Sequence, residues 1–389
     1  MKKILIFILF MSIFSAFSQD IDYLNYIDLR NKEAFKSYKF LFTFSQNEVY
    51  SPYFLTFQYT QLYLATKKGT NRNLASFALF IDDKAIHIKN TKLYQLLIPS
   101  DNSVTKKFKY SINIFLPDTL KYLKSYQKNF DSLIADTLIP YNAKDKNLAV
   151  KKINSVISKN TFSDINNVFD TSMISDNPDI ISVSAATFDE KLLYNFTNYV
   201  YAPFYLDSMG HSIENVKYLY SDVTVRYAES PTYKIIFLPY EDNDFSLAIV
   251  LPKKILKIDT NLNFFNFETF KMWESNQLEI KRLNLLIPEF HTESIINLKP
   301  FVSKYCPVLF QKGANYTSLV KRIVTLTDIY QYSKFEIKAE NNNLKELNRL
   351  RNKNKDEYFY ANHPFIYFLI NEKNHEVIFL GTFINPETK

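Results

Sequence analysis

The second half of the chain is built from short apolar runs separated by turn-forming residues. Residues 235–239 and 246–252 are two such runs, with a cluster of Glu, Asp and Asn between them. The runs 365–370 and 377–384 repeat this arrangement around the polar residues 371–374. Apolar runs that flank a polar turn are typical of β-hairpins. The pattern therefore predicts a large, mostly antiparallel sheet in this half.

Two stretches of the first half show helical spacing instead. Apolar residues recur at Ala149, Ile153 and Ile157, with lysines and a serine between them. A second stretch follows Ser51, and a Ser followed by Pro is typical of a helix start. Helices concentrated early and strands late predict an α+β fold. We find no internal repeat and no linker, which favours a single domain.

The first residues have the pattern of a secretory signal peptide. Lys2 and Lys3 precede an apolar stretch over 4–17, and small residues lead to a cleavage site before Gln19. We therefore predict a signal peptide over 1–18 and a mature domain over 19–389. The apolar stretch is short for a membrane span, so we expect no span after its removal. The expected location is secreted or periplasmic.

Composition excludes several other classes of protein. Cys306 is the only cysteine, so no internal disulfide can form and an exported chain must depend on packing. The net charge of +7 falls to +5 when Lys2 and Lys3 leave, a mild value that does not indicate nucleic-acid binding. The four glycines are not clustered, which argues against a phosphate-binding loop.

Taken in chain order, several segments resemble the serpin family. They are residues 50–52, 64–70, 149–155, 226–229, 238–240, 247–252, 285–290, 363–368, 379–381 and 385–386. The segments keep the family's order and spacing from about residue 35 to the end of the sequence. The resemblance implies a serpin fold with a large, mostly antiparallel main sheet, helices, a C-terminal β-hairpin and an exposed loop at about 340–362.

The resemblance also implies a function, inhibition of serine-type endopeptidases. In inhibitory serpins a protease cuts the exposed loop and becomes attached to it. The N-terminal half of the loop then inserts as a new central strand of the main sheet and drags the protease with it. Such a protein is not an enzyme and needs no cofactor. We expect a monomer.

The hinge of this loop does not suit insertion. Small uncharged residues are typical there, whereas the matching stretch here is Glu340, Asn341, Asn342, Asn343, Leu344, Lys345 and Glu346. Inserted with even-numbered residues inward, the strand buries Glu346; with odd-numbered residues inward, it buries Lys345 and Arg349. An unpaired buried charge costs several kcal/mol. Trapping by insertion is therefore disfavoured, and a non-inhibitory serpin that binds a partner or serves as a scaffold is the alternative.

The spacing of leucines in the loop also departs from a strand. Leu344, Leu347 and Leu350 are three residues apart among good helix formers, which predicts a short exposed helix.

Basic residues follow the hinge and form the candidate scissile region. These are Arg351, Lys353 and Lys355, with Asp356 after them. Counting back from Pro364 places the cut bond near Lys353, and counting forward from Glu340 places it near Asp356. A basic loop suits a trypsin-like serine protease, whose specificity pocket carries an Asp. A polyanion is an alternative partner, and a solvated loop without a partner is the simplest interpretation.

Other family positions have changed as well. The hydrogen-bonded cluster that controls opening of the sheet maps to Ser51, Phe54, Ser184 and Tyr332, and only Ser51 keeps its usual type. The five histidines are widely spaced without a metal-type pair, and no Gly-x-Ser-x-Gly motif is present. The sequence therefore predicts neither a metal site nor a hydrolase.

Overall fold

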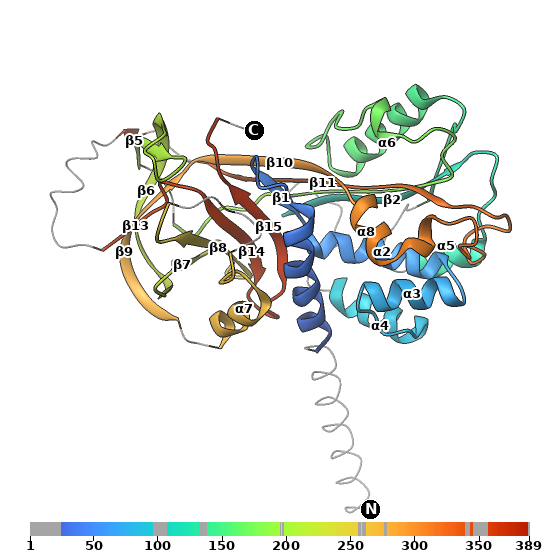
Figure 1. Cartoon of the computed structure of the whole chain (residues 1–389), viewed down its shortest axis with the longest axis horizontal. Coiled ribbons are helices and arrows are strands. Elements are labelled where there is room, and N and C mark those ends of the chain that lie inside the picture. Colours follow the sequence, from blue (N-terminus) through green and yellow to red (C-terminus); the bar gives the residue numbers. More distant parts are fainter. Residues whose placement is uncertain are drawn as a thin grey trace, which may run out of the picture.

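Two β-sheets form the framework of the protein, and helices cover them (Figure 1). The computed structural model describes residues 25–95, 107–131, 138–194, 196, 198–255, 258, 262–275, 278–338, 343–344 and 357–387. The smaller sheet, called the main sheet below, has the order β10 (Phe290–Asn297), β11 (Leu326–Ile337), β4 (Ile180–Phe188), β2 (Phe108–Pro117) and β3 (Leu138–Tyr141). Its β11–β4 and β2–β3 pairings are parallel, and the other two are antiparallel.

The second sheet has ten strands, nearly all of them antiparallel. Its order is β1 (Glu48–Tyr50), β15 (Val377–Phe383), β14 (Phe365–Asn371), β8 (Phe245–Pro252), β7 (Tyr233–Pro239), β6 (Ser212–Glu229), β5 (Asn198–Tyr205) and β12 (Asn343–Leu344). On the other side of β6 lie β9 (Glu279–Pro288) and then β13 (Tyr358–Tyr360). Only β12 and β13 pair in parallel. Most of these strands fall in the second half of the chain, as the sequence predicts.

The helices are concentrated in the first half of the chain. They are a helix over 25–41, α2 (Pro52–Ala65), α3 (Gly69–Phe77), α4 (Lys84–Gln95), α5 (Lys124–Asp131), α6 (Lys146–Asn160), α7 (Phe267–Glu274) and α8 (Lys299–Tyr305), with 3-10 turns at η1 (Thr171–Met173) and η2 (Pro307–Phe310). The α+β class is therefore confirmed. Among the described residues, no helix is both long and apolar enough to cross a membrane.

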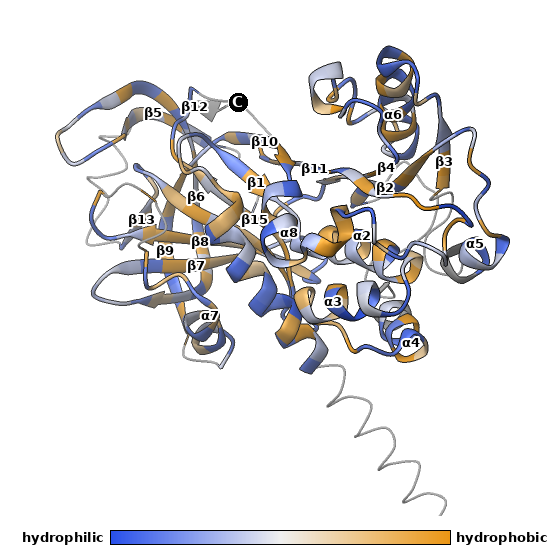
Figure 2. Ribbon diagram, turned by 45° about the vertical axis from the view of Figure 1, so that its right-hand side comes forward, coloured by the Kyte–Doolittle hydropathy of each residue, from blue (hydrophilic) through white to orange (hydrophobic). Residues whose placement is uncertain are grey.

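Helix α2 is the central element of the core. The predicted start is confirmed: the Ser51 side chain accepts a hydrogen bond from the Phe54 backbone N–H at 3.2 Å, and Pro52 follows at the first helical position. All of its residues are buried, so the helix has no solvent face, and Figure 2 shows hydrophobic residues along it. Buried Gln58 and Gln61 therefore need partners inside the protein.

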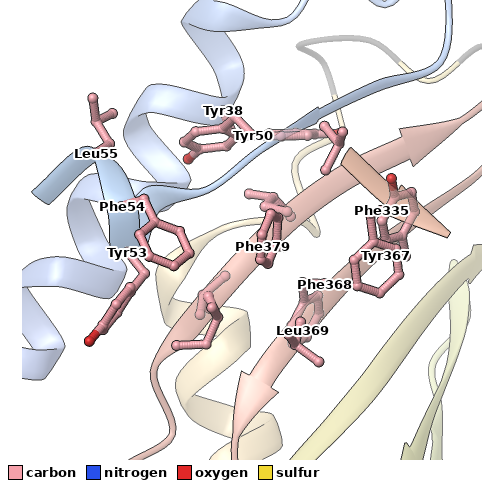
Figure 3. Close-up of a cluster of buried hydrophobic side chains, with 14 of the residues drawn as sticks. Tyr38, Tyr50, Tyr53, Phe54, Leu55, Phe335, Tyr367, Phe368, Leu369 and Phe379 are labelled. Carbon is pink, nitrogen blue, oxygen red and sulfur yellow. The ribbon is translucent and has the colours of Figure 1, made fainter. Parts of the chain in front are cut away.

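The C-terminal hairpin of β14 and β15 confirms the sequence prediction and packs against α2. Phe379 lies between Phe54 and Phe335 (Figure 3), with ring centroids 6.2 and 5.9 Å away. Gly381 faces Tyr367 across the hairpin, and a Cβ atom at Gly381 would overlap the buried Tyr367 ring. This close approach explains a glycine in the middle of a strand.

Helix α6 covers the outer face of the main sheet. Ile153 and Ile157 are buried, as the helical spacing predicts, in one cluster with Val183 and Ala185 of β4. The central strands of the main sheet are thus covered on both faces, by α2 on one side and α6 on the other.

Candidate functional site

The strands β4 and β11 pair directly at the centre of the main sheet. Their parallel register runs from Leu326 opposite Ile180 to Lys334 opposite Thr187, with one irregularity near the start. All nine residues of β4 are buried. We call this pairing the seam. The predicted hinge follows β11, and the family resemblance implies that a new central strand would enter beside β11 at the seam.

Gln58 of α2 joins the two strands of the seam from the inner face. Its side-chain amide nitrogen donates to Ser182 Oγ and to the Tyr330 carbonyl, each at 3.0 Å. Its Oε1 accepts a hydrogen bond from Ser184 Oγ at 2.9 Å. Since Ser182 and Ser184 belong to β4 and Tyr330 to β11, one buried side chain holds both strands.

Gln331 of β11 makes a second connection. Its Oε1 accepts from the Ser51 N–H at 2.8 Å, and its Nε2 donates to the Ser51 carbonyl at 3.1 Å and to Ser184 Oγ at 3.3 Å. The Ser51 hydroxyl donates to the Ile378 carbonyl of β15 at 2.6 Å. The cluster therefore ties β4, β11, α2 and the C-terminal hairpin together.

The structure corrects one predicted member of this cluster. Tyr332 lies on the opposite face of β11, where its hydroxyl donates to Glu293 Oε2 at 2.8 Å, and Gln331 takes the place assigned to it. An error of one residue along a strand exchanges the two faces of the sheet. The placements of Ser51 and Ser184 are confirmed, whereas the Phe54 side chain contributes only ring packing.

Asp164 links the outer faces of two strands that are not neighbours. It follows α6, and its carboxylate accepts from Lys109 Nζ of β2 at 3.0 Å and from Lys334 Nζ of β11 at 2.8 Å. Strand β4 lies between these two strands. Burial acts to raise the pKa of Asp164, but hydrogen bonds from the two lysines outweigh it and the pKa lies below its ordinary value. We call this arrangement the Asp164 bridge.

A further ionic group lies where β11 meets the hinge. His291 of β10 is opposite Glu336 of β11, with 3.4 Å between Nδ1 and the carboxylate, and its Nε2 lies 3.3 Å from Glu293. The hydrogen bond to Glu336 is the main reason that the pKa of His291 is raised. Lys338 Nζ donates to Glu336 at 2.6 Å. The end of β11 therefore carries a group of paired charges.

Only part of the predicted hinge and loop lies within the described residues. Asn343 and Leu344 form β12, which pairs in parallel with Asn198 and Tyr199 at the edge of the ten-stranded sheet. These two residues are thus outside the main sheet, and Leu344 is in a strand rather than in the predicted helix. The rest of the predicted hinge lies outside the described residues, namely Glu340, Asn341, Asn342, Lys345 and Glu346. So do the candidate scissile residues Arg351, Lys353, Lys355 and Asp356.

Cys306 and His363, two of the residues considered for thiol or metal chemistry, are both buried. Within the described ranges, no group of three His, Cys, Asp or Glu side chains is placed to hold a metal ion. Cys306 is buried, which raises the pKa of its thiol to about 11. His363 Nε2 lies 2.7 Å from the Pro252 carbonyl in a buried hydrogen bond.

The comparison with known families identifies the fold. A family model described as "Serpin (serine protease inhibitor)" matches residues 29–386. The chain belongs to the serpin family. Serpin B5 of Xenopus tropicalis is 21% identical over 340 residues, which cover 82% of this chain and 88% of that protein.

Two other serpins are similar over most of the chain. The leukocyte elastase inhibitor of Xenopus tropicalis is 24% identical over 313 residues, covering 77% of this chain and 80% of that protein. The crystal structure of uncleaved ovalbumin has a TM-score of 0.80 at 20% identity and covers 92% of this chain and 99% of that one. The serpin fold is thereby confirmed, with the position for a new central strand closed by the seam.

Proposed function

We propose that this serpin offers its basic loop to a trypsin-like serine protease and is cut without trapping it. Residues 340–362 would act as a substrate-like or docking loop, with the cut bond between Arg351 and Asp356. The protein would act after export, as a single domain over 19–389.

The burial of the seam on both faces carries this proposal. Adjacent residues of a strand point to opposite faces, so Lys345 and Glu346 of an inserted strand would lie on different sides of the sheet. Both faces of the sheet are covered here, one by α2 and the other by a buried cluster that includes Ile153 and Ile157 of α6. Insertion would therefore bury both charges in either register, in addition to opening the Asp164 bridge.

Inhibition by loop insertion is the second candidate function. Family membership favours it, because the matching family model is described as a serine protease inhibitor. The directly paired β4 and β11 also favour it, since this is the position that a new central strand would enter.

Incubation with trypsin, followed by denaturing electrophoresis after boiling in SDS, separates the two candidates. We expect cleavage between Arg351 and Asp356, active trypsin, and the same thermal unfolding temperature for cut and intact protein. A boiling-resistant complex at the summed mass would overturn the proposal.

A hinge variant tests the physical reason. Lys345→Ala/Glu346→Ala/Arg349→Ala removes the charges, and its cut form should unfold at a higher temperature than its intact form. The matched variant Lys353→Ala changes the loop without changing the hinge, so its cut and intact forms should unfold at the same temperature.

A further inference from the structure

One surface of the molecule combines lysines with exposed apolar side chains. The helix over 25–41 and α8 lie side by side (Figure 1). Their outer surface carries Leu29, Lys32, Lys36 and Phe40 from the first helix and Lys304 and Tyr305 from α8. We call it the lysine–aromatic face. Leu29, Phe40 and Tyr305 are 37%, 36% and 42% exposed.

The spacing along the first helix aligns these side chains. Leu29, Lys32, Lys36 and Phe40 are three or four residues apart, so they lie along one side of the helix. Apolar residues stand at both ends of this line, and two lysines stand between them. This exposed side of the helix therefore presents both basic and apolar side chains, the two kinds that contact a membrane interface.

Aromatic rings hold the lysines of the face in place. Lys36 Nζ lies 4.4 Å from the centroid of the Tyr305 ring, and Lys304 Nζ lies 4.9 Å from the Phe40 centroid. The Phe40 ring packs in turn on buried Phe301 at 5.0 Å. The lysines therefore lie beside the rings, and their long side chains can extend to lipid headgroups while the rings lie nearer the acyl layer.

The lysines of the face form no ion pair within the described residues, although the charge of Lys36 acts on the nearby Glu33 carboxylate. No ion pair joins Lys32, Lys36 or Lys304 to a carboxylate in that part of the chain. Of the two acidic residues in the helix, Asp28 pairs with Lys271 at 2.9 Å. Glu33 is 3% exposed and accepts a hydrogen bond from Ser37. An anionic partner would thus have to come from outside the molecule.

We propose that the lysine–aromatic face binds the surface of an anionic lipid bilayer. The lysines meet the headgroups, and Leu29, Phe40 and Tyr305 reach the boundary of the acyl layer. A polysaccharide chain could satisfy the lysines but offers no apolar layer to the exposed Leu29 side chain. The two exposed ends of the line therefore favour a lipid surface over a soluble polyanion. This inference does not depend on cleavage of the loop.

Cosedimentation of the purified chain with vesicles tests the proposal. Vesicles of phosphatidylglycerol and phosphatidylcholine at 3:7 should bind the protein, and pure phosphatidylcholine should not. Each lysine contributes about fivefold to binding, so Lys32→Gln/Lys36→Gln/Lys304→Gln should weaken it about a hundredfold. The control Lys151→Gln/Lys152→Gln/Lys159→Gln changes three exposed lysines of α6 and should weaken it much less.

A second variant distinguishes insertion into lipid from binding to charge alone. In Leu29→Trp, the new indole should shift its emission to the blue when the anionic vesicles are added, whereas buried Trp273 should not respond. Equal binding by the two lysine triples would overturn the proposal. The proposal would also be overturned if the vesicles bound the protein without a blue shift and heparin abolished that binding, because the partner would then be a soluble polyanion.

Discussion

The C-terminal hairpin and the seam are both buried strand pairings, but they are held by different forces. The hairpin pairs β14 with β15 in antiparallel register, and aromatic rings and the Gly381–Tyr367 contact fill its surroundings. The seam pairs β4 with β11 in parallel, and Gln58, Gln331 and the Asp164 bridge connect its strands. Apolar packing thus dominates in the hairpin, and satisfied buried polar contacts dominate in the seam. The hairpin should therefore be most sensitive to added volume, and the seam to the loss of a polar partner.

The largest effect is expected from crowding the hairpin. Gly381→Ala places a Cβ against the Tyr367 ring, which is buried and stacked on Phe335 at 5.2 Å, and should lower the free energy of unfolding by about 3 kcal/mol. Urea denaturation measures the loss. Gly313→Ala is the control, because no atom lies near the added Cβ. Equal losses in the two variants would show that the hairpin is not closely packed at Gly381.

A smaller effect is expected from removing a hydrogen-bonding side chain from the inner face of the seam. Gln331→Leu leaves the Ser51 N–H without its partner and should destabilise the protein by about 2 kcal/mol in urea denaturation. Exposed Gln311 provides the matched control Gln311→Leu, for which we expect little change. If Gln331→Leu were neutral, the cluster would not hold the seam.

The Asp164 bridge should contribute about 1 kcal/mol at neutral pH, because its groups are partly exposed. Asp164→Asn removes this contribution, and Asp118→Asn, at an exposed site, is the control. The folded-state pKa of Asp164 is depressed, so the contribution is present above the unfolded value of about 3.9 and is lost as pH falls through the folded value. Denaturation from pH 7 to pH 2 should therefore show the wild type and the variant converging at low pH. A difference that stayed constant would contradict the ionic explanation.

The smallest effect concerns His291 of β10, which lies opposite Glu336 near the end of β11. Its pKa is raised, chiefly by Glu336, so its contribution is full below the unfolded value of about 6.5 and is lost as pH rises through the folded value. The stability difference between the wild type and His291→Gln should be greater at pH 5.5 than at pH 8.5. The opposite trend would show that the histidine is held in its neutral form.

The sequence predicts the hairpin far better than it predicts the seam. The apolar runs 365–370 and 377–384 match β14 and β15 because a hairpin is a local structure with its own turn. The seam joins residues more than a hundred positions apart, and Tyr332 was placed on the wrong face since a strand alternates faces at every residue. Buried Gln58 and Gln61 were a usable signal, as two glutamines three apart within an apolar helix need internal partners. Nothing in the sequence marks Asp164, whose role comes only from the loop that carries it over β4.

The position of β15 also determines when the molecule can finish folding. Glu48 pairs with Thr382, 334 positions later, and α2 packs against the same strand. During synthesis the N-terminal segments therefore wait, without their central neighbours, until residue 383 has left the ribosome. Until then β1 and β8 of the ten-stranded sheet lack their partners β15 and β14, and unpaired strand edges favour aggregation.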